Sequence, residues 1–331
     1  MARNVAPMPD DPSPRVVDEP GRSSSVMASR ERAGRERASK KKKKRKKKKQ
    51  NPVATIISVL IILVGIAVMV YPVVATQINN IRQGEMAALQ REEIAAAKRS
   101  DPKVLEEGLA AAHEYNANAP SVPVSDPWSA QDHTADNPEY AAYLEQLNDF
   151  STMGTVTIPT INSSMPIYHG TAPATLDKGV GHLYGTSLPV GGNGTHSVLT
   201  AHTGLRQATA WDNLIDVTEG DEIFVEVYGE TMKYRVYATN VVLPTDTDAL
   251  MFNDRSRELL TLITCTPYGV NSHRLLVHAE RVELTAADRE MLEETSNFVM
   301  QWWMWLVVAV VALLLAWVIW RVVRAMREAK N

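Results

Sequence analysis

The chain has 331 residues, a formal net charge of −3 and a single cysteine. This length fits one large domain or two ordinary ones, and one cysteine excludes an internal disulfide. The charge is unevenly distributed: residues 1–75 carry +11, residues 76–301 carry −17 and residues 302–331 carry +3. An acidic body therefore lies between two basic ends.

The N-terminal residues 1–51 are predicted to be disordered and basic. Residues 1–39 are rich in Pro, Ser, Arg and Asp and contain few apolar residues, a composition that cannot build a core. The run KKKKKRKKKK at Lys40–Lys49 is of a kind that can bind nucleic acid. It lacks interleaved aromatic residues and adjoins an apolar run, so it favours a role in membrane topology and in contact with anionic lipid. We expect no nucleic-acid partner.

Two uncharged apolar runs flank the acidic body, at residues 52–75 and 302–320. A helix rises about 1.5 Å per residue, so roughly 20 apolar residues cross a bilayer core of about 30 Å. Tryptophans at both ends of the second run are typical of an interfacial belt. Because Lys and Arg gather outside both runs, the positive-inside rule predicts a two-pass cell-membrane protein with both termini in the cytoplasm. The acidic body is then extracytoplasmic.

Residues 76–150 are predicted to form a helical stalk followed by an irregular segment. Residues 78–115 are rich in Ala, Glu, Gln and Arg, which favour a helix, and Pro102 marks the first turn of a restart. The stretch 116–138 is rich in proline and shows little periodicity, and the short helix PEYAAYLEQLND is expected after it. Trp128 lies in the irregular stretch, where its ordinary interpretation is a packed residue of a surface loop.

From Met153 onward, short runs of β-branched and aromatic residues alternate with turn residues. Examples are SVLTAH, DEIFVEVYG, TMKYRVYATNVVLP, LLTLITC and HRLLVHAERVEL. Such a series with few helices predicts a β-barrel or a β-sandwich of roughly 140 residues. Gly229-Glu230 predicts a hairpin turn. Gly191–Gly194 predicts a loop rather than a phosphate site, since no Lys-Ser/Thr pair follows it.

Cys265 is the first candidate for chemistry, with two interpretations. A lone buried cysteine is most often a small hydrophobic residue. A thiol near a histidine or arginine can instead act as a nucleophile. Cys265 ends a strand-like run, His202 ends another, and Arg274 begins the run that follows the cysteine. If the last two runs pair as neighbouring strands, Arg274 lies beside the end of the cysteine strand.

Other chemistries find less support. The remaining candidate histidines are scattered near turns or in the last strand: His169, His182, His196, His273 and His278. They lack the clustered spacing of a zinc site. A Ser-His-Asp hydrolase is also unsupported, because the chain has no Gly-x-Ser-x-Gly elbow. We therefore expect neither a metal nor a cofactor.

Several motifs together resemble the sortases, and in particular the pilin-polymerising class C of Gram-positive bacteria. TLITCTPYGVNSHRLLV is similar to the sortase signature in which an arginine follows the cysteine, and HSVLTAHTG is similar to the histidine strand. IPTINSSMPIYHG and KGVGHLYGTSLPVGG resemble class C strands, and SDPWS resembles the class C lid motif. The resemblance covers about residues 80–285. One departure is AHTG, where many relatives have Gly-His-Arg-Gly.

The resemblance implies a mainly β fold: an eight-stranded sortase-type β-barrel with N-terminal helices and a lid loop, flanked by two transmembrane helices. The implied division of the chain runs from N- to C-terminus. It comprises a cytoplasmic tail (1–51), a transmembrane helix (52–75), a stalk and lid (76–150), the catalytic barrel (151–285), a juxtamembrane linker (286–301), a second transmembrane helix (302–320) and a cytoplasmic tail (321–331).

The resemblance also implies the site and the reaction. Cys265 would be the nucleophile, His202 the proton donor, and Arg274 the residue that holds the substrate or stabilises the oxyanion. Trp128 would cover the thiol as a lid, with Asp126 near Arg274. The enzyme would cleave an LPxTG-like signal between Thr and Gly through a thioester and pass the acyl group to a pilin lysine.

Two alternatives remain open at this stage. A housekeeping sortase would attach surface proteins to peptidoglycan, using a wall-precursor amine to resolve the thioester. A membrane-anchored β-domain could instead serve as a binding or scaffold protein without catalysis. The first differs in the acceptor amine, and the second predicts that Cys265→Ala has no effect.

Overall fold

The computed structural model describes residues 52–118, 124–128, 136–205, 208–246, 256–294 and 299–330. Its contacts divide the chain into two compact units, Met1–Val59 and Leu60–Asn331, and every contact discussed below lies within the second. The predicted disordered N-terminus, residues 1–51, lies outside the described residues.

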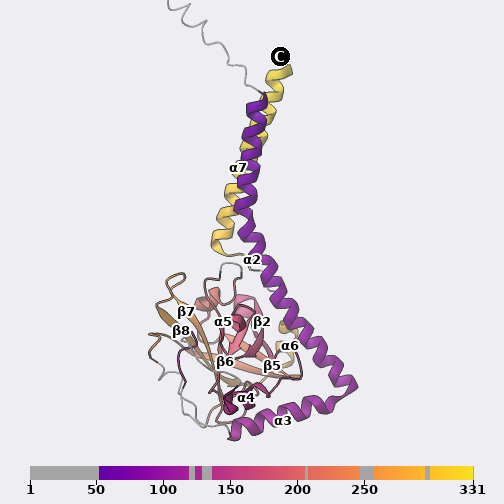
Figure 1. Cartoon of the computed structure of the whole chain (residues 1–331), viewed down its shortest axis with the longest axis vertical. Helices are drawn as coiled ribbons and strands as arrows, with labels where there is room; N and C mark the ends of the chain where they lie inside the picture. Colours follow the sequence, from indigo (N-terminus) through magenta and orange to yellow (C-terminus); the bar gives the residue numbers. More distant parts are fainter. Residues whose placement is uncertain are drawn as a thin grey trace, which may run out of the picture. The chain divides into compact units, whose positions relative to one another are not determined.

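Three helices precede the β-structure: α2 (Pro52–Ser100), α3 (Pro102–Asn118) and α4 (Pro138–Leu144) (Figure 1). The expected restart at Pro102 is confirmed. The first apolar run and the stalk form one continuous helix, which contains both Pro72 and Gly84. Helix α4 ends at Leu144, short of the predicted end at 149, and the chain then turns through Leu147 at φ 50°.

One face of α2 is buried at alternating spacings of four and three residues: Thr76, Asn80, Gln83, Ala87, Gln90 and Ile94. This spacing keeps side chains on one face of a helix. Asn80 Oδ1 accepts the Thr209 backbone N–H at 2.9 Å, and Asn80 Nδ2 donates to Thr209 Oγ1 at 2.8 Å. Gln90 donates to the Thr152 carbonyl at 3.1 Å and accepts from the Thr155 hydroxyl at 2.8 Å. Paired amide hydrogen bonds therefore attach α2 to the β-domain.

Eight strands form a closed barrel in the order β1-β2-β3-β4-β7-β8-β6-β5. Their bounds are β1 (Gly154–Ile158), β2 (Ser163–His169), β3 (Val180–His182), β4 (His196–Thr200), β5 (Glu222–Val227), β6 (Glu230–Val242), β7 (Leu259–Thr266) and β8 (His273–Val282). Short helices η1 (Pro159–Ile161), α5 (Pro173–Leu176) and η2 (Asp212–Asp216) lie in the connections. The expected eight-stranded barrel is confirmed, and the alternative of a sandwich is excluded.

The barrel core is apolar and fully buried around Trp211, Met153, Ile167, Leu199 and Ile223. The β5–β6 hairpin turns at Tyr228 and Gly229, with φ of 50° and 89°, one residue earlier than predicted. A two-residue turn with positive φ at both positions matches the twist of the paired strands. The Tyr228 hydroxyl bonds the Asp149 carboxylate at 3.0 Å, which fixes this residue in the unusual conformation.

Two further helices follow the barrel, α6 (Ala286–Glu294) and α7 (Trp302–Lys330). Helix α6 occupies part of the segment predicted as a linker. Lys233 on β6 is buried and its Nζ lies 2.8 Å from Asp288 on α6 and 2.8 Å from Glu222 on β5. This buried ion cluster joins α6 to two barrel strands.

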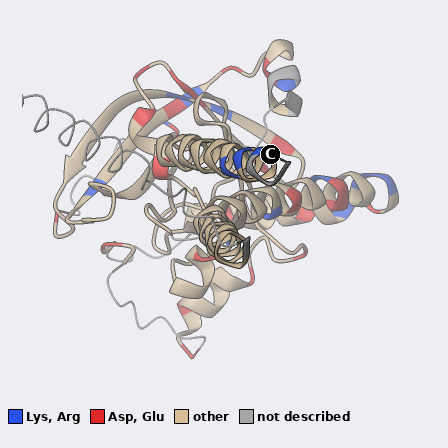
Figure 2. Cartoon of the chain, turned by 90° about the horizontal axis from the view of Figure 1, so that it is seen from above, with Lys and Arg blue, Asp and Glu red and all other residues tan. Residues whose placement is uncertain are grey.

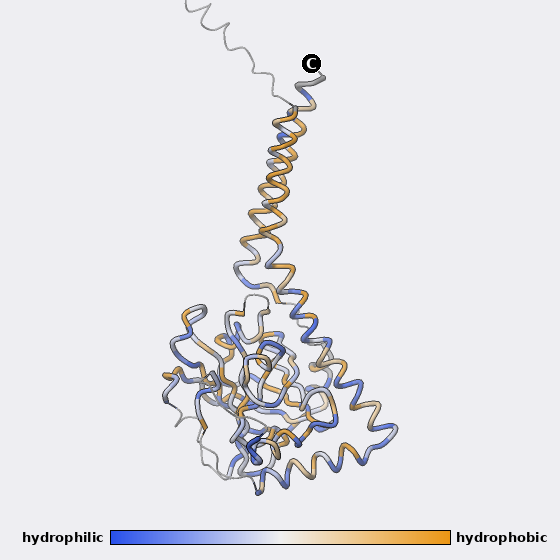
Figure 3. Tube along the Cα trace, in the orientation of Figure 1, coloured by the Kyte–Doolittle hydropathy of each residue, from blue (hydrophilic) through white to orange (hydrophobic). Residues whose placement is uncertain are grey.

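Helices α2 and α7 are long and apolar enough to cross a membrane over Val53–Ser100 and Trp302–Arg327, a test of length and composition only. Figure 3 shows apolar residues along much of both helices. Figure 2 shows Lys and Arg at the C-terminal end of α7, beyond its apolar part. These two helices match the spans expected from the sequence.

Candidate active site

Cys265 lies near the end of β7, directly opposite Arg274 in the antiparallel pairing of β7 with β8. Residues opposite each other in an antiparallel pair project to the same face of the sheet. Pro267 follows the strand and offers no N–H for the ladder, which explains why β7 stops at Thr266. Cys265 and Arg274 are both buried, with 6% and 9% of their surfaces exposed. The expected proximity of Arg274 to the cysteine strand is therefore confirmed.

A parallel pairing of β4 with β7 brings His202 to the same end of these strands as Cys265. Thr200 pairs with Ile263, so His202 and Cys265 each lie two residues beyond the same pair. The segment beyond β4 is fixed by hydrogen bonds to β7: the Thr264 hydroxyl donates to the Ala201 carbonyl at 2.8 Å. The register thus places the imidazole and the thiol at one rim of the barrel.

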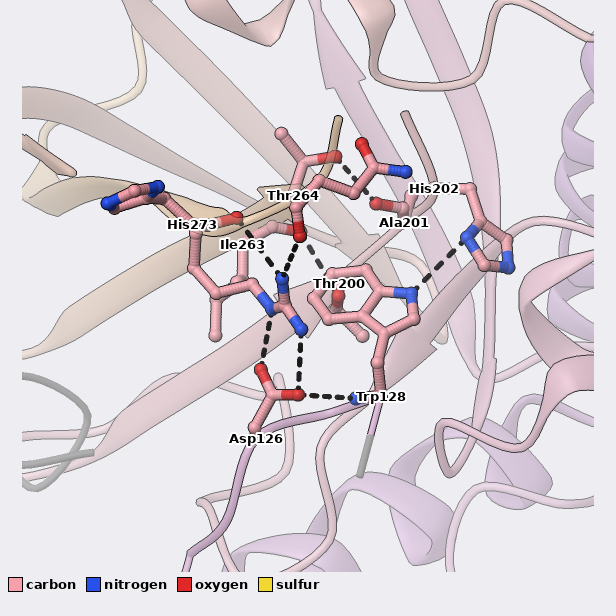
Figure 4. A network of polar contacts seen from close by, with 10 residues as sticks. Asp126, Trp128, Thr200, Ala201, His202, Ile263, Thr264 and His273 are labelled. Carbon is pink, nitrogen blue, oxygen red and sulfur yellow. Dashed lines mark hydrogen bonds and ion pairs between the residues drawn. The ribbon is translucent and has the colours of Figure 1, made fainter. Parts of the chain in front are cut away.

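The segment with Asp126 and Trp128 lies across this rim (Figure 4). Arg274 donates from Nε to Asp126 Oδ1 at 2.6 Å and from Nη2 to Asp126 Oδ2 at 3.0 Å. The same carboxylate accepts the Trp128 backbone N–H at 3.3 Å. Two parallel bonds between a guanidinium and a carboxylate are a strong and directional pairing.

The Trp128 side chain contacts both His202 and Arg274. Its indole Nε1–H donates to His202 Nδ1 at 3.2 Å, and the Arg274 guanidinium carbon lies 4.7 Å from the ring centre. An imidazolium has no free lone pair on Nδ1, so the indole bond requires the neutral imidazole. The closed segment therefore holds the histidine in its uncharged form.

An apolar patch receives the rest of the indole. It consists of Leu183, Val198, Ile263 and Leu276, with Val124 and Val242 packed against it beside Trp128. This patch lies on the outer side of β4, β7 and β8, separate from the barrel core. Val124 and Trp128 thus cover an apolar patch that includes Ile263, two residues before Cys265 on β7.

The electrostatics of the closed site favour neutral side chains. Burial raises the pKa of the Cys265 thiol; Arg274 opposes this shift, whereas Asp126 adds to it. Burial lowers the pKa of His202, and the field of Asp177 opposes that shift. Asp126 thus compensates the positive charge of Arg274, which favours a thiolate.

Sequence reasoning missed the residues that connect the histidine and cysteine segments. Thr203, which follows His202, shares a 2.5 Å hydrogen bond with Thr264, which precedes Cys265. The His202 carbonyl accepts the Trp211 backbone N–H at 3.1 Å, and the Asp212 carboxylate accepts the Gly204 N–H at 2.7 Å. Burial raises the pKa of Asp212 to about 7. The one available signal was that a threonine adjoins each of the two candidate residues.

The competing histidines have structural partners. His182 is fully buried, with ring nitrogens bonded to the Tyr143 hydroxyl at 3.0 Å and the Ser187 carbonyl at 2.8 Å. His196 and His278 both bond the Thr261 hydroxyl. Among the residues that the structure describes, no three His, Cys, Asp or Glu side chains are grouped to hold a metal ion.

A thiol, an imidazole and a guanidinium at one rim of a closed β-barrel form a site suited to cysteine-based acyl transfer. Comparison with known proteins agrees with this class. The sortase domain family matches residues 156–282. Sortase D of Bacillus subtilis (strain 168) is 32% identical over 133 residues, covering 39% of this chain; the chain spans 63% of the length of that relative.

Solved structures extend the similarity beyond the matched domain. Sortase C-1 from Actinomyces oris is 51% identical, with 55% of this chain and 99% of that chain covered and a TM-score of 0.53. Sortase A from Corynebacterium diphtheriae is 46% identical over 62% of this chain and 98% of its own, with a TM-score of 0.55. Sortase C-1 from Streptococcus pneumoniae is 38% identical over 61% and 100%, with a TM-score of 0.54. The chain belongs to the sortase family of transpeptidases, and its structural neighbours include class C sortases.

Proposed function

We propose that this chain is a membrane-anchored class C sortase that assembles covalent pili. It cleaves an LPxTG-like sorting signal between Thr and Gly and transfers the acyl group to a lysine amine of a pilin. The observation that carries the proposal is the direct pairing of Cys265 with Arg274, with His202 two residues beyond the matching pair on β4. The lid formed by Asp126 and Trp128 supports the class C assignment.

The catalytic roles follow from the chemistry of the three side chains. The Cys265 thiolate attacks the threonine carbonyl, and Arg274 stabilises the oxyanion of the tetrahedral intermediate. The His202 imidazolium gives its proton to the departing glycine amine, leaving a thioester and a neutral imidazole. The pilin amine, once neutral, attacks the thioester and passes its extra proton to His202. The C–S bond then breaks and the thiolate returns.

The lid regulates entry to this cycle. While it is closed, Asp126 accepts two hydrogen bonds from the Arg274 guanidinium, and Trp128 covers the apolar patch and donates to the imidazole Nδ1 of His202. Opening frees Arg274 to favour the thiolate and frees His202 to accept a proton. The same movement exposes the apolar patch to the apolar part of a sorting signal.

Membrane anchoring places the enzyme where its substrates pass. Helices α2 and α7 span the bilayer, the basic ends remain in the cytoplasm, and the barrel is extracytoplasmic. A sorting signal and a pilin lysine are both encountered on that side of the membrane.

The reaction is tested by incubating the full chain in detergent with an LPxTG-type peptide, followed by mass spectrometry. We expect an acyl adduct on Cys265 that is absent in Cys265→Ala, and transfer of the acyl group to a pilin lysine added afterwards. A wall-precursor amine offered in parallel distinguishes pilus assembly from wall anchoring. Absence of the adduct, with the lid both intact and mutated, would rule out the proposed reaction.

A further inference from the structure

The segment that carries His202 leaves β4 after Thr200 and leads to η2. Because residues 201–204 lie beyond the strand, the position of the imidazole depends on the hydrogen bonds that this segment makes with its neighbours. A displacement of about 1 Å in a reacting group can lower a rate about a hundredfold. The contacts of residues 201–204 therefore decide whether His202 can transfer a proton at the site.

Two hydrogen bonds from the cysteine strand hold the first half of this segment. The Thr264 hydroxyl donates to the Ala201 carbonyl at 2.8 Å (Figure 4). The same hydroxyl shares a 2.5 Å bond with the hydroxyl of Thr203. Since Thr264 precedes Cys265 on β7, these bonds fix residues 201–203 against the strand that carries the thiol. Neither bond extends beyond Thr203.

Asp212, the first residue of η2, holds the next position. Its Oδ1 accepts the Gly204 backbone N–H at 2.7 Å, and such bonds to a carboxylate are short and strong. Gly204 has a φ of 80°, which glycine adopts without strain. A Cβ at Gly204 would lie 3.7 Å from the backbone nitrogen of Gly269. Asp212 thus fixes the turn after the histidine where it adjoins the turn after the cysteine strand.

The start of η2 holds the histidine segment at two points. The Trp211 backbone N–H donates to the His202 carbonyl at 3.1 Å, and the adjacent Asp212 side chain accepts from Gly204. Trp211 is fully buried in the barrel core, so this end of η2 is attached to a rigid part of the fold. The two bonds lie on either side of Thr203, which the cysteine strand holds.

We propose that Asp212 is a positioning residue for His202. Through the Gly204 backbone, its carboxyl oxygen keeps the imidazole where it can give a proton to the leaving amine. This inference rests on the proposed function, in which His202 is the proton donor. The field of Asp177 raises the pKa of His202 against the effect of burial, whereas Asp212 reaches the histidine through a hydrogen bond. Asp212 therefore has to supply an acceptor oxygen and not a negative charge.

The chemistry of the leaving group separates this role from a general effect on the fold. When the Cys265 thiolate attacks an amide, a C–S bond forms and the C–N bond breaks as His202 protonates the departing amine. When the same thiolate attacks a thioester, the leaving group departs with its electron pair as a thiolate. A thiol has a pKa of about 8.5, far below that of an amine leaving group, so no proton is needed. A displaced imidazole therefore slows only the amide reaction.

The test compares two donor peptides with the full chain in detergent. One is an LPxTG-type peptide, and the other has mercaptoacetate in place of the glycine, so that a thioester replaces the Thr–Gly amide. Acylation of Cys265 is followed by mass spectrometry over a series of peptide concentrations. We expect Asp212→Ala to lower the maximal rate with the amide about tenfold, with an unchanged half-saturating concentration. The rate with the thioester should not change.

Two further variants complete the test. Asp212→Asn keeps an acceptor oxygen for Gly204 and should retain most of the rate with the amide. Asp221→Ala is the matched control, because Asp221 Oδ2 accepts the Thr218 backbone N–H at 2.7 Å in the turn between η2 and β5. This control removes a bond of the same kind and length, and acylation by both peptides should remain unchanged.

Three outcomes overturn the positioning role. Equal slowing with the amide and the thioester would indicate a general distortion, and so would an equal effect of Asp221→Ala. An Asp212→Asn variant as slow as Asp212→Ala would show that an acceptor oxygen is not what the site requires. If neither peptide acylates Cys265 in the unmutated chain or in Asp126→Ala, the proposed function itself fails. Normal acylation by Asp212→Ala is a different result, which refutes only the role of Asp212.

Discussion

At the scale of single residues, Arg274 has two competing partners. In the closed site its guanidinium makes two bonds to Asp126 and lies against the Trp128 ring. The same group stands opposite Cys265 in the strand pairing, where it favours a thiolate. In the proposed mechanism, the lid therefore controls catalysis by pairing with the positive charge that favours the thiolate.

We predict that Asp126→Ala or Trp128→Ala increases the rate at which a thiol reagent modifies Cys265 by about tenfold or more. Removing one partner of a buried ion pair leaves the other uncompensated and destabilises the closed state. Reagent kinetics followed by mass spectrometry measure the change. Asp136→Ala, an exposed acidic residue between the lid segment and α4, is the control and should not alter the rate. Equal rates in all four proteins would contradict a lid role.

Sequence reasoning reached part of this site. The distance along the chain between Cys265 and Arg274 suggested neighbouring strands, because an antiparallel pair needs only a short turn. The approach of His202 depends on a parallel pairing between strands separated by two others in the chain, which spacing alone does not reveal. The prediction that His202 belongs to the site rested on the resemblance to a family, and so did the prediction of a lid. The Thr203–Thr264 bond is a consequence of that pairing and was not predicted.

At the scale of elements, the histidine segment depends on helix α2. Asn80 holds Thr209 through two buried hydrogen bonds, and the Trp211 backbone then bonds the His202 carbonyl. A short path of hydrogen bonds thus joins the helix to the imidazole-bearing segment.

We predict that Asn80→Ala lowers the free energy of unfolding by about 1–3 kcal/mol, the cost of losing two buried hydrogen bonds. It should also slow acylation of Cys265, because His202 loses its positioning. Gln90→Ala removes a similar pair of hydrogen bonds from the same face of α2, but the partners of Gln90 are Thr152 and Thr155 rather than the segment that follows His202. This variant should therefore lower the free energy of unfolding without slowing acylation. A double-mutant cycle with Thr209→Ala should give a coupling of about 1 kcal/mol. Equal effects of Asn80→Ala and Gln90→Ala on acylation would contradict a positioning role.

The elements themselves were largely predictable, with informative exceptions. Strands with β-branched alternation and the helix restart at Pro102 follow from local chemistry. The continuity of α2 was missed because the change from apolar to polar residues marks a change of surroundings, not of backbone conformation. Helix α6 was missed because its attachment depends on Lys233, a distant residue on β6.

At the scale of the whole molecule, buried histidines link stability to pH. Burial lowers the pKa of His182 to about 4 and that of His196 to about 4, below their ordinary value near 6.5. The unfolded chain therefore binds more protons than the native state in this range. The stability contributed by these two histidines is fully present above pH 6.5 and is lost as pH falls toward 4. Asp212, whose pKa is raised to about 7, contributes in the opposite direction, because its stabilisation is lost as pH rises toward 7.

We predict that the free energy of unfolding falls by about 3 kcal/mol for His182 alone between pH 7 and pH 4. Denaturant unfolding at a series of pH values measures this slope, and His182→Gln should flatten it. The carboxylate of Asp288, whose pKa its hydrogen bond to Lys233 lowers to about 2, loses its contribution only below this window. Because Asp212 acts in the opposite direction over the same window, the contribution of His182 is read from the difference in slope between the unmutated chain and His182→Gln. Equal slopes in the two proteins would show that His182 remains accessible to protons.

The membrane arrangement gives a prediction of its own. In a Cys265→Ala background, single cysteines introduced at Ser24 and Arg327 should resist a membrane-impermeant thiol reagent on intact cells. A cysteine at the exposed Asp101 should react, because the proposed orientation places this residue on the extracytoplasmic side. Labelling at either terminus before cell lysis would contradict the two-pass orientation.

The shared register of β4 and β7 restricts how this sequence can change in length. Deleting one residue from β4 would shift His202 by about 3.3 Å and turn its side chain to the opposite face. A matching deletion in β7 would not repair the site, because Cys265 would then slip past Arg274 on β8. Insertions and deletions accumulated over evolution are therefore expected in the connections, while these three strands keep a constant number of residues.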